Sequence, residues 1–303
     1  MSSWDPATCL LASTCRDNPV HLWDAYNGKL VATYRYYNNV DEVEAAHSVC
    51  FDTSGERLFC GFDSKIAIFN VAVPGRDFEV RKLKEKGRVS QQGIISCISF
   101  NEAMPSLYAL GSFSKTIGIY MESDANPLCL LQGQVGGVTH LKFSPDGTKL
   151  YSGGRKDPEI LCWDLRSPGK ILYNFQREVA TNQRIYFDLD PSGSFLVSGS
   201  TSGNVRIWDS LNGDEISEPE ECVQVQGASW NLHSDCVNGI SLHSWLPILA
   251  STSGQRHFAE PVHDSDPDSE DPDAPLLTKK YMKRSQENAV KLWWLGDPLS
   301  LNV

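Results

Sequence analysis

The 303-residue chain carries a formal net charge of −11 and 41% hydrophobic residues, enough apolar side chains to bury a large core. The acidic charge argues against a protein that coats nucleic acid nonspecifically, because such binding needs a basic surface. Any nucleic-acid contact therefore has to be local. No apolar run approaches the roughly 18 residues of a membrane span. The first residues, MSSWDPATCLLAS, also lack the features of a secretory signal, so we expect no membrane partner.

The nine cysteines are an odd number and are scattered singly, without a CxxC pair. This pattern is typical of buried thiols in a reducing compartment rather than of a disulfide framework.

Strand-like apolar segments that end in an aromatic residue recur along the whole chain, as in HLWDA, IAIFN and LCWDL. The aromatic positions are Trp23, Phe69, Tyr120, Trp163, Trp208 and Trp293. The first five are spaced about 45 residues apart, which is the repeat length of four-stranded propeller blades. The pattern therefore predicts an all-β fold, a WD-repeat β-propeller with six blades visible.

Each repeat divides into short β-like runs separated by turns. The fifth repeat, for example, reads RIYFDLD, the turn DPSG, SFLVSGS, TSG and NVRIWD. Comparable turns at residues 25–28, 52–55 and 144–147 end in glycine, which supplies the positive φ that tight hairpins need. Helical periodicity of comparable length is absent, so an α/β alternation is not expected.

We expect residues 1–303 to form a single β-propeller domain with an insertion at 257–288. The acidic, proline-rich first half of this insertion cannot bury enough apolar surface to order itself, which predicts a disordered loop in the last blade. A partner-binding or phosphoregulated segment is the alternative. The chain begins almost directly at the second strand of the first blade, so we expect it to lack the N-terminal blade of a seven-bladed ring.

The segments between the aromatic positions are more specific than a general Trp-Asp signal. CRDNPVHLWDAYNGKL, AAHSVCFD, LFCGFDSKIAIFN, GGRKDPEILCWDLR, NQRIYFDLDPSGSFLVSGSTSG and LASTSGQR closely resemble the telomerase Cajal body protein family of WD-repeat propellers. The resemblance runs from about residue 18 to residue 294. Two features usual in that family, an acidic disordered N-terminal region and a further blade, do not precede this segment here.

The resemblance implies a nuclear scaffold that binds the Cajal body box, a short loop motif in small Cajal-body RNAs and in telomerase RNA. It implies that these particles are taken to the Cajal body, with some of the protein in the cytoplasm. The partners it implies are telomerase and box H/ACA ribonucleoprotein proteins, other Cajal body proteins and a chaperonin that assists folding.

The sequence contains no motif of a familiar catalytic site. A GxSxG elbow, an HExxH helix, a Walker loop and a cysteine cluster with zinc spacing are all missing, and the seven histidines are isolated. We therefore expect no enzyme activity, no cofactor and no metal site.

Propeller geometry sends two kinds of loop to one face, which we call the upper rim. These are the loops between the second and third strands of a blade and those between an outermost strand and the next blade. Unpaired RNA bases stack on aromatic or guanidinium planes while cations hold the phosphates. The residues that we predict to bind RNA on the upper rim are Arg16, Phe62, Phe113, Lys115, Arg155, Lys156, Arg184 and Arg256.

All of these assignments have open alternatives. Each cation on its own also fits a solvated turn residue, and Phe62 and Phe113 fit packing between blades as well as stacking on a base. The grouping of the residues on one face supports the RNA interpretation. The turns of the opposite face carry mainly aspartate and glutamate.

A second function class stays open. CWDLR matches the short WDxR pattern of propellers that resemble substrate receptors of cullin ubiquitin ligases. A protein-only adaptor of that kind would use Asp164 and Arg166, which we expect on the face opposite the upper rim.

Overall fold

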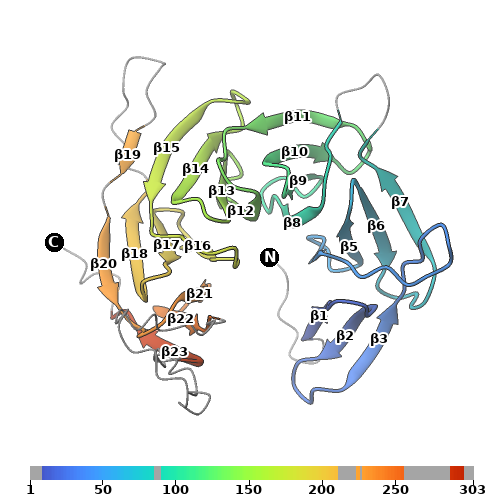
Figure 1. Cartoon of the computed structure of the whole chain (residues 1–303), viewed down its shortest axis with the longest axis horizontal. Helices are drawn as coiled ribbons and strands as arrows, with labels where there is room; N and C mark the ends of the chain where they lie inside the picture. Colours follow the sequence, from blue (N-terminus) through green and yellow to red (C-terminus); the bar gives the residue numbers. More distant parts are fainter. Residues whose placement is uncertain (1–8, 85–89, 211–222, 226, 256–286, 297–303) are drawn as a thin grey trace, which may run out of the picture.

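The computed structural model describes residues 9–84, 90–210, 223–225, 227–255 and 287–296. Over these ranges the chain forms 23 strands and no helix, in six sheets arranged as the blades of an open ring (Figure 1). The prediction of an all-β propeller with six blades is confirmed. Within the same ranges, no helix long and apolar enough to cross a membrane occurs.

The first three blades follow the chain order without interruption. Blade 1 holds β1 (Leu10–Ser13), β2 (Val20–Asp24) and β3 (Leu30–Tyr34). Blade 2 holds β4 (Ser48–Phe51), β5 (Arg57–Phe62), β6 (Lys65–Asn70) and β7 (Phe78–Lys82). Blade 3 holds β8 (Ile95–Phe100), β9 (Leu107–Ser112), β10 (Thr116–Met121) and β11 (Pro127–Gln132).

One strand crosses between blades 4 and 5, which the sequence did not predict: β19 (Val223–Val225) lies between two strands of blade 5 in the chain but pairs with the outer edge of blade 4. Blade 4 holds β12 (Val138–Phe143), β13 (Lys149–Gly154), β14 (Glu159–Asp164), β15 (Ile171–Gln176) and, parallel to β15, β19. Blade 5 holds β16 (Phe187–Leu189), β17 (Phe195–Gly199), β18 (Asn204–Asp209) and β20 (Ala228–Asn231). Blade 6 holds β21 (Val237–Leu242), β22 (Ile248–Ser253) and β23 (Ala289–Trp294).

The aromatic repeat positions all lie on the third strand type, the one after the upper-rim hairpin, and they fill the spaces between neighbouring blades. Trp163, for example, is fully buried in a cluster that joins blades 3 and 4. Trp208 packs against Phe175 of blade 4 with ring centroids 5.8 Å apart. Apolar side chains therefore recur along the strands because each blade buries them against its neighbouring blades.

Turn chemistry fixes the two ends of the hairpins. Gly55 and Gly147 adopt φ values of 75° and 73° in turns on the lower face, as their sequence context predicts. On the upper rim, Lys115 and Lys156 adopt φ values of 66° and 49°, a conformation uncommon for residues other than glycine. Two of the predicted RNA-binding cations thus adopt a left-handed conformation, Lys115 directly before β10 and Lys156 three residues before β14.

The two end blades differ from the inner ones in having three strands each. β2 of blade 1 carries Trp23 as β6 of blade 2 carries Phe69, so β1 occupies the second position of its sheet, as the sequence predicts. β22 and β23 pair directly, Ser253 with Ala289, at either side of the inserted segment. Most of the predicted loop at 257–288 lies outside the described residues.

Candidate functional site

The candidate site is built around the loop at residues 155–158, which joins β13 to β14 on the upper rim. Its Asp157 side chain is fully buried and accepts three hydrogen bonds. The Oδ2 atom accepts from Nε2 of Gln134 (2.9 Å) and from the backbone N–H of Gly136 (2.8 Å). The Oδ1 atom accepts from the backbone N–H of Glu159 (3.1 Å). The buried Asp157 side chain therefore ties the loop at residues 155–158 to the neighbouring segment that carries Gln134 and Gly136.

A chain of hydrogen bonds connects this loop to the core of blade 4. Gln134 Oε1 accepts from Oγ of Ser152 (2.8 Å), which in turn accepts from Nε1 of Trp163 (2.8 Å). All the side chains of this chain are buried, so every bond is made in a medium where an unpaired polar group is costly. The loop is consequently fixed before any ligand arrives.

The Arg155 side chain lies over the Phe113 ring of blade 3, with Cζ 4.3 Å from the ring centroid. Cation–π attraction favours this arrangement. Gly137 makes room for it, because a Cβ atom there would lie 2.8 Å from the Phe113 carbonyl oxygen and 3.2 Å from Nε of Arg155. The Arg155 backbone N–H also donates to the Gly137 carbonyl (3.0 Å). The Arg155 guanidinium therefore packs against the Phe113 ring on the upper rim.

Lys156 connects the same loop to blade 5. Its side chain is exposed, while its backbone N–H donates to the carbonyl of Thr181 (3.0 Å). Three residues further on, Arg184 donates from Nη2 to the carbonyl of His47, which directly precedes β4 of blade 2 (2.8 Å). The upper rim therefore joins Phe113, Arg155, Lys156 and Arg184 through adjacent loops of blades 3, 4 and 5.

The remaining predicted residues are placed differently. Lys115 is exposed on the hairpin that carries Phe113. Arg16 is also exposed, but it belongs to blade 1 and contacts Asp17 at 3.5 Å, so it does not join the cluster on blades 3 to 5. Arg256 lies outside the described residues.

The prediction that Phe62 presents a stacking face is wrong. The residue is 1% exposed and packs against Tyr36, with ring centroids 4.4 Å apart. Lys65 lies over the same ring, 5.8 Å from its centroid. Phe62 ends β5 with its side chain directed into the core between blades 1 and 2, so no face remains for a base.

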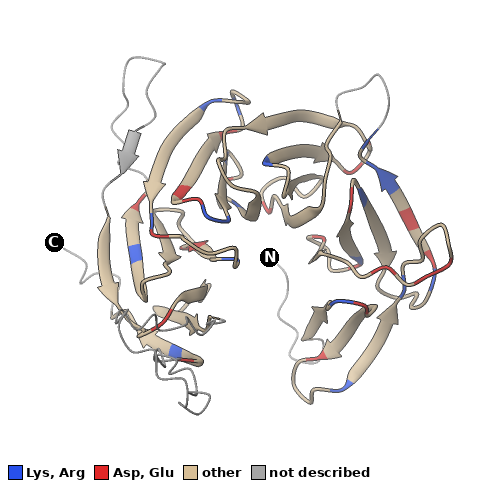
Figure 2. Ribbon diagram, in the orientation of Figure 1, with Lys and Arg blue, Asp and Glu red and all other residues tan. Residues whose placement is uncertain are grey.

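Charge on the upper rim is mixed. Glu178 is exposed near the cluster and contacts Arg206 at 3.4 Å, and Asp63 is exposed on blade 2. Figure 2 shows Lys and Arg positions interspersed with Asp and Glu positions around the ring. This mixture agrees with the acidic net charge of the chain.

Sequence reasoning missed Gln134, Gly136, Gly137 and Asp157, which shape the site without facing a ligand. The paired glycines in GQVGGV were a visible signal of close backbone approach. The role of Asp157 is set by Gln134, 23 residues away, and local sequence carries no sign of that contact.

The opposite end of β14 holds a different arrangement. Arg166 donates from Nε to Oδ1 of Asp164 (3.0 Å) and from Nη2 to Oδ2 (3.1 Å). These bonds from Arg166 lower the pKa of the Asp164 carboxyl below its ordinary value. Arg166 and Arg155 follow and precede the same strand, so the predicted placement of the two motifs on opposite faces is confirmed.

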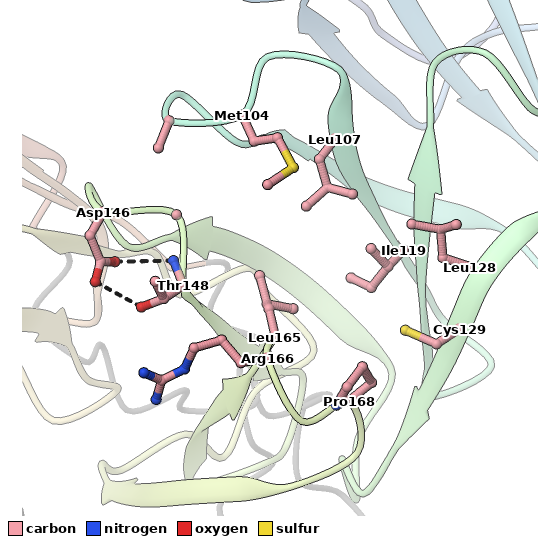
Figure 3. A pocket seen from close by; sticks show the side chains of 12 residues that line it. Met104, Leu107, Ile119, Leu128, Cys129, Asp146, Thr148, Leu165, Arg166 and Pro168 are labelled. Atoms are coloured by element: carbon pink, nitrogen blue, oxygen red, sulfur yellow. Dashed lines mark hydrogen bonds between the residues drawn. The ribbon is translucent and has the colours of Figure 1, made fainter.

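A groove of about 390 Å³ lies next to Arg166, between blades 3 and 4 (Figure 3). Its walls are mostly apolar, with polar groups confined to Asp146, Thr148 and Arg166. The apolar side chains that line it include Met104, Leu107, Ile119, Leu128, Leu165 and Pro168. The described residues contain no group of three His, Cys, Asp or Glu side chains that could hold a metal ion.

Comparison with known proteins agrees with this architecture. The family "WD domain, G-beta repeat" matches residues 125–164 and 181–209. Telomerase Cajal body protein 1 of Homo sapiens is 50% identical over 296 residues, which cover 98% of this chain and 52% of that protein. The Drosophila melanogaster homolog of Telomerase Cajal body protein 1 is 36% identical over 311 residues, which cover 98% and 54%.

The chain thus spans about half the length of the curated relatives it matches. Among solved structures, a chain of the mitotic checkpoint complex has a TM-score of 0.62 and 20% identity, covering 81% of this chain and 69% of that chain. This second likeness concerns the fold alone.

Proposed function

Because the chain is a WD-repeat β-propeller homologous along nearly its whole length to the telomerase Cajal body proteins, we propose that it is an RNA-binding scaffold. It recognises the Cajal body box loop of small Cajal-body RNAs and of telomerase RNA. It directs these ribonucleoproteins to Cajal bodies in the nucleus and so supports telomerase trafficking and telomere maintenance.

The observation that carries the proposal is the Arg155 guanidinium fixed on Phe113 beside the exposed Lys156. Sequence-specific RNA recognition targets unpaired bases, which stack on aromatic and guanidinium planes, while cations contact the phosphates. Both kinds of group are present here on a loop that the buried Asp157 holds in place. A loop fixed in advance loses little conformational entropy on binding.

The partners that follow are the two RNA classes, telomerase and box H/ACA ribonucleoprotein proteins and Cajal body proteins, with a chaperonin for folding. The names of the relatives support the telomerase and Cajal body associations. The propeller fold and these names point to a non-catalytic protein. The same reasoning leads to nuclear localisation, with a cytoplasmic fraction during assembly.

Crosslinking in nuclear extract tests the proposal most broadly. The tagged protein is crosslinked, purified under denaturing conditions, and the attached RNA is sequenced. We expect enrichment of RNAs that carry the Cajal body box, with crosslinks within the box loop. A matched Arg155→Ala/Lys156→Ala variant should lose this enrichment. Background RNA alone with the parent protein would contradict the proposal.

A protein-only adaptor, such as a cullin ubiquitin ligase substrate receptor, is the second candidate. The groove beside Arg166 favours it, because an apolar cleft between blades fits a partner's side chains. An Asp164→Ala/Arg166→Ala variant should then lose a cullin adaptor partner in affinity purification and keep its RNA. If the parent recovers no such partner, this candidate fails.

A further inference from the structure

Tyr186 is an aromatic side chain exposed at a position where its equivalents in blades 2 and 3 are buried. Ser48 and Cys97 each pair with a glycine of the next strand, at the upper end of the innermost strand of blades 2 and 3. They are 5% and 6% exposed. Tyr186 holds the corresponding position in blade 5, where its carbonyl accepts from the N–H of Gly199 (3.4 Å), yet it is 37% exposed. A large aromatic ring is thus exposed at the upper end of the innermost strand of blade 5.

His140 of blade 4 fixes the position of this ring. The two rings meet edge to face, with centroids 4.8 Å apart and an interplanar angle of 63°. His140 Nε2 is 3.0 Å from the Phe187 carbonyl oxygen, to which it donates in the matching tautomer. Desolvation lowers the pKa of His140 to about 3, so its imidazole is neutral at neutral pH. The Tyr186 backbone N–H is also held, by the carbonyl of Asn238 at 3.0 Å.

A cation precedes the same ring in the chain. Arg184 lies two residues before Tyr186, in the segment that leads into β16. Arg184 contributes to the lowered pKa of His140, which places its charge near the histidine that touches Tyr186. Its Nη2 hydrogen bond to the His47 carbonyl (2.8 Å) links this loop of blade 5 to blade 2. The exposed aromatic ring and the cation thus belong to one loop of the upper rim.

This pairing matches the chemistry of a single nucleotide, which offers a base to stack and a phosphate to neutralise. We propose that Tyr186, held by His140 beside Arg184, is a stacking face for one unpaired nucleobase of the bound RNA. The site rests on the proposed RNA-binding function and adds a second contact point to that of Phe113 and Arg155. The two points are linked along the upper rim, because Lys156 binds Thr181 at the start of the segment that leads to Tyr186.

The test compares Tyr186→Ala, Tyr186→Leu and Tyr186→Phe in the 303-residue chain, using a labelled hairpin with a Cajal body box loop. Loss of a stacked base corresponds to roughly a 5- to 100-fold weaker binding. We expect that loss for the Ala and Leu variants and parent-like binding for the Phe variant. The salt dependence of binding should stay unchanged, since no phosphate contact is removed. The Leu variant retains apolar bulk and so separates stacking from folding, which circular dichroism monitors.

A second measurement identifies the base. Hairpins with one abasic loop position at a time are titrated against parent and Tyr186→Leu protein. At the stacked position, the abasic change should weaken the parent and have no further effect on the variant. If the Leu variant binds as tightly as the parent while Arg155→Ala/Lys156→Ala loses affinity, the Tyr186 site is wrong and the proposed function stands. If the parent does not prefer the hairpin over a scrambled loop, the proposed function itself fails.

Discussion

The two ends of β14 show how one strand can present charge in two ways. At the upper end, the Asp157 carboxylate is turned into the core, where it binds Gln134 and a backbone N–H. In the described part of the chain, no ion pair forms with Arg155 or Lys156. At the lower end, the Asp164 carboxylate turns outward and binds both donor edges of Arg166. The Asp157 carboxylate thus holds the loop that carries the cations of the upper end, whereas the Asp164 carboxylate pairs with the cation of the lower end.

This difference separates the two candidate surfaces. A ligand with many negative charges gains most where cations are held in place and have no partner of opposite charge. The upper end meets that condition. The lower end offers an apolar groove instead, which suits a protein side chain. The strand therefore connects the surface proposed to bind RNA with the surface proposed for a protein partner.

Removing the Asp157 and Asp164 carboxylates one at a time should give the largest difference between the two ends of β14. Asp157→Ala removes the buried acceptor of three hydrogen bonds, so we expect a loss of unfolding free energy on the order of 3 kcal/mol. Affinity for the hairpin should fall by more than tenfold because the loop is no longer held. Asp164→Ala should cost about 1 kcal/mol or less, since its partner Arg166 is exposed. Urea denaturation measures both values, and equal losses would contradict the distinction.

Acid should affect the contributions of His140, on β12, and of Asp164, at the end of β14, in different pH windows. The folded pKa of His140 lies below its unfolded value, so between about pH 6.5 and pH 3 the unfolded chain binds the extra proton. Stability supported by neutral His140 is therefore lost as the pH falls below 6.5, by about 1.4 kcal/mol per pH unit. Asp164, whose folded pKa is lowered, contributes stability that is fully present above the ordinary carboxyl pKa of 3.8 and is lost only on further acidification.

Denaturation of the parent and of His140→Gln at pH 7, 6 and 5 checks this window. The difference in stability between the two proteins should shrink steadily from pH 7 to pH 5. Asp164→Ala should show a constant difference from the parent over the same range. A His140→Gln difference that does not change with pH would contradict the assignment.

The aromatic support of Arg155 should have a smaller effect. Phe113→Ala removes the ring beneath the guanidinium, and exposed cation–π contacts contribute about 0.5–1 kcal/mol. We expect hairpin binding to weaken two- to fivefold. Leu128→Ala, at the groove on the lower face, is the matched control and should bind RNA as the parent does. Fluorescence anisotropy resolves these differences. A larger loss of hairpin affinity for Leu128→Ala than for Phe113→Ala would place the RNA on the lower face and contradict the assignment to the upper rim.

Much of this arrangement follows from local sequence. Trp163 and its counterparts predicted the blade positions, because a large aromatic residue at a regular interval fills the space between sheets. Turn glycines such as Gly147 predicted the hairpins, because the backbone there needs a positive φ. The sorting of Arg155 and Arg166 to opposite faces followed from strand count alone.

What local sequence could not show is how separate loops meet. Arg184 contacts His47 across 137 positions, and β19 joins blade 4 from the segment between β18 and β20 of blade 5. Phe62 and Phe113 occupy similar places next to upper-rim turns, but Phe62 points into a core and Phe113 supports Arg155. The direction of a side chain at the end of a strand depends on the neighbouring blade, which the repeat pattern does not specify.

Salt-dependent binding of the triple variant Arg155→Ala/Lys156→Ala/Arg184→Ala tests the central claim most directly. A Cajal-body-box hairpin and a scrambled loop are titrated at several salt concentrations, with circular dichroism as the check on folding and Asp164→Ala as the control for the lower face. Each lost phosphate contact should reduce the slope of log affinity against log salt by about one unit, and each lost base contact should cost roughly 1–3 kcal/mol and relax the preference for the box loop. The account predicts weaker, less selective and less salt-dependent binding for the folded triple variant and parent-like binding for Asp164→Ala. Parent-like binding by the triple variant at every salt concentration, together with loss of binding in folded Asp164→Ala, would contradict it.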